Sequence, residues 1–169
     1  MIKFIEGNKF TFLVLLGSGI FIRFLMLWLV DYRLDAGDAA NYLVASKNIL
    51  NYGIFSGGEG LVIQPDFYRP PGYPFFLSLI FRHFDESILA VRLIQIIISI
   101  FTALLVAAIA LKLIPNSAIW VFGLMMLSPF EAVYSGAVLS ETVTAFLITL
   151  LVANLILIQG LKKWFCAGF

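Results

Sequence analysis

The stretch LIQIIISIFTALLVAAIAL, residues 93–111, is 19 residues long and contains no charged side chain. A helix rises 1.5 Å per residue, so about 20 apolar residues are needed to cross a hydrocarbon core roughly 30 Å thick. The stretch therefore predicts a membrane-spanning helix, which we expect over residues 88–113.

Three further stretches approach the same length: residues 10–30, 117–134 and 137–159. The middle one carries Pro129 and Glu131, so we expect its far end to be bent or unwound. The prediction is an all-α integral membrane protein. We expect residues 1–169 to form a single membrane domain with about four transmembrane helices.

The composition agrees with this fold class. Hydrophobic residues make up 62% of the chain and charged residues 12%, and the mean hydropathy is +1.01. Soluble domains are closer to 45–50% apolar and about 25% charged. No run of basic residues indicates a nucleic-acid partner. The single histidine, His83, excludes a multi-histidine metal site within the chain, and the single cysteine, Cys166, excludes an intramolecular disulfide.

Between the first two expected spans lies a long outer loop, residues 31–87, for which we predict two interfacial helices. Residues 38–52 place apolar and polar side chains on opposite faces of a helix, with Gly53 as a C-terminal stop. Residues 72–81 are apolar but only half as long as a span. The prolines at positions 70, 71 and 74 fit the first turn of a helix lying on the membrane surface.

Orientation follows from the bias of lysine and arginine toward cytoplasmic flanks. With four spans, the cytoplasmic side of the membrane would carry five lysines: Lys3, Lys9, Lys112, Lys162 and Lys163. The acidic residues of the loop 31–87 then face outward. We therefore expect a multi-pass protein of the inner (cytoplasmic) membrane with a cytoplasmic N-terminus.

This topology brings Asp38, Arg69 and Glu141 to the outer membrane surface from distant parts of the sequence. A partly desolvated carboxylate can act as a general base or a metal ligand, and an arginine fork can hold a phosphate or pyrophosphate. Simpler interpretations remain for two of them, because Asp38 could cap the interfacial helix and Arg69 could contact lipid headgroups. Arg23 lies deeper, and we expect it to pair with a carboxylate such as Glu131.

Three motifs occur in a recognisable order: GDAANY at residues 37–42, YRPPGYPFFLSLIF at 68–81 and LSPFEAVYSGAVLSET at 127–142. In order and spacing, the chain resembles the N-terminal part of GT-C type membrane glycosyltransferases. These include protein O-mannosyltransferases and lipid A aminoarabinose transferases. The resemblance runs from about residue 23 to residue 158.

The resemblance implies roles for four residues. Asp38 and Glu141 would be catalytic, with Asp38 as the acceptor base or an acceptor-positioning group, while Arg69 and Tyr42 would lie at the donor phosphate. The implied reaction moves a sugar from a polyprenyl-phosphate donor to a lipid, glycan or protein acceptor on the outer side, by an inverting displacement. No organic cofactor is implied, and Glu141 would assist positioning or bind a divalent metal.

Family members usually have many more spans than four. We therefore expect this polypeptide to be a fragment that is catalytically silent alone, because four spans form only one wall of a donor cavity. The alternative is a non-catalytic membrane subunit or a transporter fragment. Transporters place their binding groups near the membrane midplane, where only Arg23 of this chain would lie.

Overall fold

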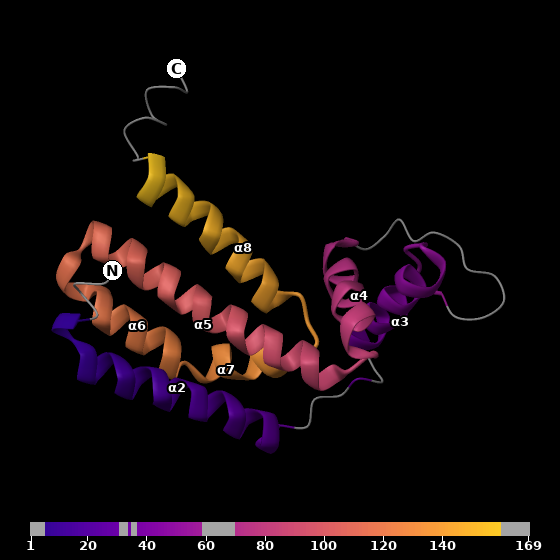
Figure 1. Cartoon of the computed structure of the whole chain (residues 1–169), viewed down its shortest axis with the longest axis horizontal. Coiled ribbons are helices and arrows are strands. Elements are labelled where there is room, and N and C mark those ends of the chain that lie inside the picture. The colour runs from indigo at the N-terminus through magenta and orange to yellow at the C-terminus, as the bar shows by residue number, and fades with distance from the viewer. Residues whose placement is uncertain (1–5, 31–33, 35–36, 59–69, 160–169) are drawn as a thin grey trace.

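The computed structural model describes residues 6–30, 34, 37–58 and 70–159, and every regular element within these ranges is helical (Figure 1). In chain order, the elements are α2 (Lys9–Leu29), α3 (Gly37–Tyr52), α4 (Gly72–Phe84), α5 (Ile88–Leu113), the 3₁₀ turn η1 (Pro115–Ser117), α6 (Ala118–Leu127), α7 (Pro129–Gly136), α8 (Glu141–Ala153) and the π-helical turn η2 (Asn154–Gln159). The predicted all-α class is confirmed for this part of the chain.

Two helices, α2 and α5, are each long and apolar enough to cross a membrane. A third crossing results if α6 and α7 are counted as one bent span. The apolar helix that begins at Glu141 and runs to Leu157 is shorter than a full span. The structure therefore supports two or three candidate crossings, and the fourth stays a prediction.

The bend between α6 and α7 has a local cause at Pro129. The two helix axes differ by 52°, and Ser128 between them is extended, with φ −62° and ψ 120°. Proline disfavours the helical conformation in the residue before it and has no N–H to donate. The Ser128 side chain then caps α7 by accepting from the backbone N–H of Glu131 at 3.3 Å. The predicted bend in residues 117–134 is thus confirmed.

Small residues let α2 approach α6 closely. A Cβ built on Gly19 would lie 2.4 Å from Cε and 2.8 Å from Cβ of Met126, so only glycine fits without a shift. One end of the contact is closed by Phe12 and Phe122, whose rings stack with centroids 4.8 Å apart. Met126 and Phe122 belong to a core that α6 shares with α5 and α2.

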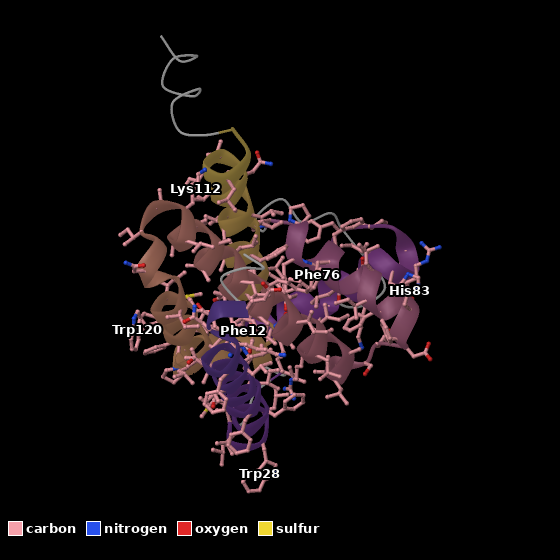
Figure 2. All side chains as sticks on the ribbon, turned by 60° about the vertical axis from the view of Figure 1, so that its left-hand side comes forward. Phe12, Trp28, Phe76, His83, Lys112 and Trp120 are labelled. Atoms are coloured by element: carbon pink, nitrogen blue, oxygen red, sulfur yellow. The ribbon has the colours of Figure 1, made fainter. Side chains whose placement is uncertain are left out.

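The outer faces of these helices carry large apolar side chains. Among the most exposed are Phe10, Trp28, Trp120, Leu124 and Phe130. Figure 2 shows Trp28 near the end of α2 and Trp120 on α6 pointing away from the bundle. An apolar surface of this extent is unfavourable in water and suits contact with lipid chains.

The helices α3 and α4 pack against each other at one end of the bundle, beyond the end of α2 and the start of α5 (Figure 1). Helices are therefore present at both places predicted for the outer loop, with α4 extending three residues past the expected end at position 81. The start of α2 and the end of α5, which carry Lys9 and Lys112, lie at the opposite end of the bundle.

Two further contacts fix this helix pair. The Asn48 amide donates to the carbonyls of Ser56 and Gly58, at 2.8 and 2.9 Å, which secures the chain after α3. An ion pair of 2.7 Å joins Lys47 to Glu86 in the turn between α4 and α5. Both side chains are substantially exposed, so the pair contributes at most about 1 kcal/mol.

The close approach at Gly19 predicts a position-specific cost. Replacing Gly19 with alanine should destabilise the protein by about 1–3 kcal/mol, because the added methyl group overpacks against Met126. Gly17 provides the matched control on the same helix, because its built Cβ meets nothing within 4 Å. Gly17→Ala should be neutral, or stabilising by up to about 1 kcal/mol. Denaturant unfolding in detergent micelles measures both variants, and equal effects would contradict this packing.

Candidate functional site

A cavity of about 250 Å³ lies between α3, α4 and the beginning of α8. Its walls come from all three sequence motifs. Tyr42 belongs to the first motif, and Pro70, Gly72 and Tyr73 belong to the second. The third wall is the start of α8, where Ser140 belongs to the third motif and Val143, Thr144 and Leu147 follow it. Segments separated by about a hundred residues in sequence thus meet at one small site.

Tyr73 forms the inner side of this site. Its ring packs edge-on against Tyr42, with centroids 5.0 Å apart, and stacks on Phe76 at 5.9 Å. Its hydroxyl donates a hydrogen bond to Oε1 of Gln95 on α5. Burial raises the pKa of Tyr73 well above its usual range, and the charge of Glu141 and the Tyr42 phenol raise it further. Tyr73 therefore stays neutral and acts as a hydrogen-bond donor.

Gln95 connects the site to the bundle, and its side chain is completely buried. The Nε2 group donates to the carbonyl of Ala137 at 2.5 Å and, more weakly, to that of Ser135 at 3.4 Å. Together with the bond from Tyr73, one amide holds α4 and the end of α7 against α5. A buried amide with a partner at each end is stabilising, whereas losing one partner leaves a costly unpaired group.

Asp38 lies in the first turn of α3, one residue inside the helix, and is exposed. Asp38 and Tyr42 are four residues apart, so they lie on the same face of the helix. No hydrogen bond of the Asp38 side chain occurs within the described part of the chain. The described structure therefore does not support the interpretation of Asp38 as a helix cap.

Glu141 is the first residue of α8 and is exposed. Its charge acts on Tyr73, and its neighbour Ser140 lines the cavity. The next residue, Thr142, fixes this helix start, because its Oγ1 donates to the carbonyl of Tyr134 in α7 at 3.1 Å. Asp38 and Glu141 are thus carried by two of the three elements that line the cavity.

The predicted phosphate ligand Arg69 lies outside the described residues. Its neighbour in sequence, Pro70, lines the cavity. Sequence reasoning missed Gln95, which appeared only as one polar residue in an apolar run, and also the hydroxyls of Ser140 and Thr144. A glutamine within a predicted membrane span was the available signal, because such residues are rare and need a partner.

No group of three or more His, Cys, Asp or Glu residues close enough to hold a metal ion occurs in the ranges that the structure describes. The predicted option of a divalent metal at Glu141 therefore has no ready set of protein ligands there.

Three other cavities in the described part of the chain are larger but differ in chemistry, and one of them, of about 380 Å³, lies between α3 and α4 beside Ser78 and Arg82. Another, of about 810 Å³, lies between α2 and α6, with a mainly apolar lining and no charged side chain. A third, of about 400 Å³, lies beside the ion pair of Lys47 and Glu86. Both lysine and glutamate are already paired in that cavity. The smaller cavity at Tyr42 and Tyr73 is the one where the sequence motifs meet.

No protein-family model, curated protein or solved structure matches the chain. A proposal for its function therefore rests on the chemistry of this site.

The buried contact between Tyr73 and Gln95 predicts a loss of stability on removal of one hydroxyl. Tyr73→Phe should cost about 1–3 kcal/mol, because Oε1 of Gln95 is left buried without a donor. Tyr52 is 62% exposed and provides the control, so Tyr52→Phe should change stability little. Thermal unfolding in lipid nanodiscs compares the two variants. Equal unfolding temperatures would show that the Tyr73 hydroxyl does not stabilise the site.

Proposed function

We propose that the chain is part of a membrane glycosyltransferase of the GT-C type, which transfers a sugar from a polyprenyl-phosphate donor to an extracytoplasmic acceptor. The observation that carries this proposal is the cavity shared by Tyr42, Pro70, Tyr73 and the start of α8. The three motifs that prompted the resemblance are far apart in sequence, yet residues from all three line one cavity.

The site has two chemical zones that suit a lipid-linked sugar. Its inner lining is aromatic and apolar, and it contains only neutral donors and acceptors. The two carboxylates, Asp38 and Glu141, are exposed at the ends of helices beside it. An apolar inner zone fits the first units of a prenyl chain or the face of a sugar ring, while exposed acids remain available to an acceptor hydroxyl.

In the proposed reaction, Asp38 takes the proton of the acceptor hydroxyl as its oxygen attacks the anomeric carbon. The bond from that carbon to the phosphate oxygen breaks, and polyprenyl phosphate leaves with the bonding electrons. Arg69 holds the leaving phosphate beside Tyr42, and Glu141 positions the reacting groups. A planar guanidinium matches the geometry of phosphate oxygens and neutralises the charge that develops on them.

The proposal includes four membrane crossings, with α8 as the fourth, and a cytoplasmic N-terminus in the inner membrane. Two features support this orientation. Lys9 and Lys112 lie at one end of the bundle, and the paired helices α3 and α4 lie at the other (Figure 1). Positive flanks are retained in the cytoplasm, so the cavity would open at the outer surface, where a lipid headgroup lies.

The competing function is a non-catalytic membrane subunit or a transporter fragment. A transport pathway would make use of a charged residue within the spans, and Arg23 is the residue at that depth. Its side chain is fully buried and bonded to helix backbone, not directed toward a water-accessible path. This favours a structural task for Arg23 and leaves the outer site as the place for chemistry.

Orientation is tested by labelling single cysteines in intact cells, on a Cys166→Ser background. A cysteine at Gly58, just after α3, should react with an impermeant maleimide added outside. One at Leu113, beside Lys112, should react only after the cells are opened. Reversed labelling would contradict the proposed function, because the donor phosphate would then face the wrong side.

Donor recognition is tested at the phosphate, which needs only groups on the wall that this chain supplies, by binding polyprenyl phosphate to the purified chain in lipid nanodiscs. Arg69→Ala should weaken binding on the order of ten- to hundredfold, because a charge-assisted phosphate contact contributes roughly 1.5–3 kcal/mol. Arg82→Ala is the matched control, because Arg82 is an exposed arginine near the end of α4, about three turns from Tyr73.

Asp38→Asn should leave this binding unchanged, because the proposed role of Asp38 concerns the acceptor proton. Equal weakening in the Arg69 and Arg82 variants would indicate nonspecific attraction to anionic lipid and would contradict a phosphate site at Arg69.

A further inference from the structure

We infer that Arg23 is a remote positioning residue for the cavity at Tyr42 and Tyr73. It fixes the break between α6 and α7 and, through α5 and α7, sets where α8 begins. The fixing of the break stands on hydrogen bonds alone, whereas its consequence for donor binding rests on the proposed function.

The first step is the contact that Arg23 makes at the break. In an unbroken helix, the carbonyl of Met126 would accept from the N–H of Phe130. The bend separates that pair, and Nη1 of Arg23 donates to the Met126 carbonyl at 2.9 Å instead. Nη1 also reaches the Gly19 carbonyl of its own helix at 3.1 Å. Arg23 therefore replaces the helix bond that the proline break removes.

The second step runs along one face of α5. Nε of Arg23 donates to Oγ of Ser99 at 2.8 Å, and Ser99 in turn donates to the Ile96 carbonyl. Gln95 lies one turn before Ser99 on the same face, where it donates to the carbonyl of Ala137. Two buried polar residues of α5 thus hold the chain on either side of α7: Ser99, through Arg23, at the end of α6, and Gln95 at the end of α7.

The third step leads from α7 to the cavity. Ala137 is the C-cap of α7, and only three residues separate it from Glu141, the first residue of α8. Thr142 adds a bond back to Tyr134, so the direction of α7 determines where Ser140 and Glu141 lie. Ser140 lines the cavity, and Glu141 acts on Tyr73. A change of angle at the break would therefore be passed on to the cavity wall.

The identity of the side chain supports a role in geometry. Nη2 of Arg23 is buried and has no hydrogen-bond partner among the described residues, and the charge of Glu131 acts on Arg23 without a direct ion pair between them. An apolar residue of similar volume would avoid burying this incompletely bonded charge, and such replacements are often neutral or stabilising. An apolar residue could not donate to the backbone carbonyls and to Ser99 at the same time, as the guanidinium does.

The experiment measures the break directly. Spin labels at Trp120 and Tyr134, exposed positions on either side of the break, are introduced into the full chain on a Cys166→Ser background in nanodiscs. Straightening the 52° bend would lengthen this separation by about 2 Å at 1.5 Å rise per residue. Dipolar EPR should give one narrow distance with Arg23 present and a longer, broader distribution in Arg23→Met.

Graded variants and a matched control accompany this measurement. Arg23→Lys should give an intermediate distribution, because an ammonium can serve one acceptor but not the whole fork, and Ser99→Ala should give a smaller broadening. Arg82→Met removes an exposed arginine from α4 and should leave the distance unchanged. If Arg23→Met fails to insert, the lysine and Ser99 variants decide the same question. Unchanged distances in Arg23→Met, or in these two variants where Arg23→Met does not insert, would overturn the inference.

The same samples are tested for binding of polyprenyl phosphate. Loss of affinity in Arg23→Met, together with the altered distance, supports the positioning role. An altered distance with unchanged affinity would overturn the link to the cavity. If the unsubstituted chain does not bind polyprenyl phosphate while the distances still respond to Arg23, the proposed function fails and the role of Arg23 at the break stands.

Discussion

The arrangement of this protein depends on one hydrogen bond, from the guanidinium of Arg23 to the carbonyl of Met126. A helix broken inside a hydrocarbon layer exposes backbone groups that no water can satisfy. Pro129 creates such a break, and Arg23 supplies the donor from another helix. The contact is possible because Gly19, one turn before Arg23, lets α2 approach α6. The direction of α7, and with it the start of α8, follows from this contact.

The candidate site separates neutral from charged polar groups. Tyr73 and Gln95 are buried and neutral, and they satisfy each other and the backbone of the α7–α8 connection. Asp38 and Glu141 carry the charge and are exposed to solvent. Burying a neutral network avoids the free-energy cost of taking a charge out of water, and such a network can be rigid. Exposed carboxylates remain hydrated and can exchange bound water for a substrate. Such a division gives a rigid neutral scaffold with charged groups at its edge.

Much of the fold was predictable because apolar length and proline act locally. The span at α5, the bend near Pro129 and both surface helices follow from residues adjacent in sequence. For the site, the predicted topology brought Asp38 and Glu141 to the same side of the membrane, and the elements that carry them, α3 and α8, both line the cavity. The expected pairing of Arg23 with a carboxylate such as Glu131 takes a different form: the charge of Glu131 acts on Arg23, but the hydrogen bonds of the guanidinium go to Ser99 and to backbone carbonyls. Every residue has a backbone carbonyl, so the sequence does not indicate which carbonyls accept hydrogen bonds from Arg23 and Gln95.

The burial of Arg23 also affects when α2 becomes stable in the membrane during synthesis of the protein. During synthesis, α2 reaches the translocon first, with an arginine that costs about 2.5–3.5 kcal/mol at the centre of an inserted helix. Its partners Ser99 and Met126 follow 76 and 103 residues later. At typical elongation rates of roughly 5–20 residues per second, this leaves an interval of several seconds. During that interval, the Arg23 side chain in α2 would lack its partners on other helices. The inserted α2 would become stable only when α6 packs beside it.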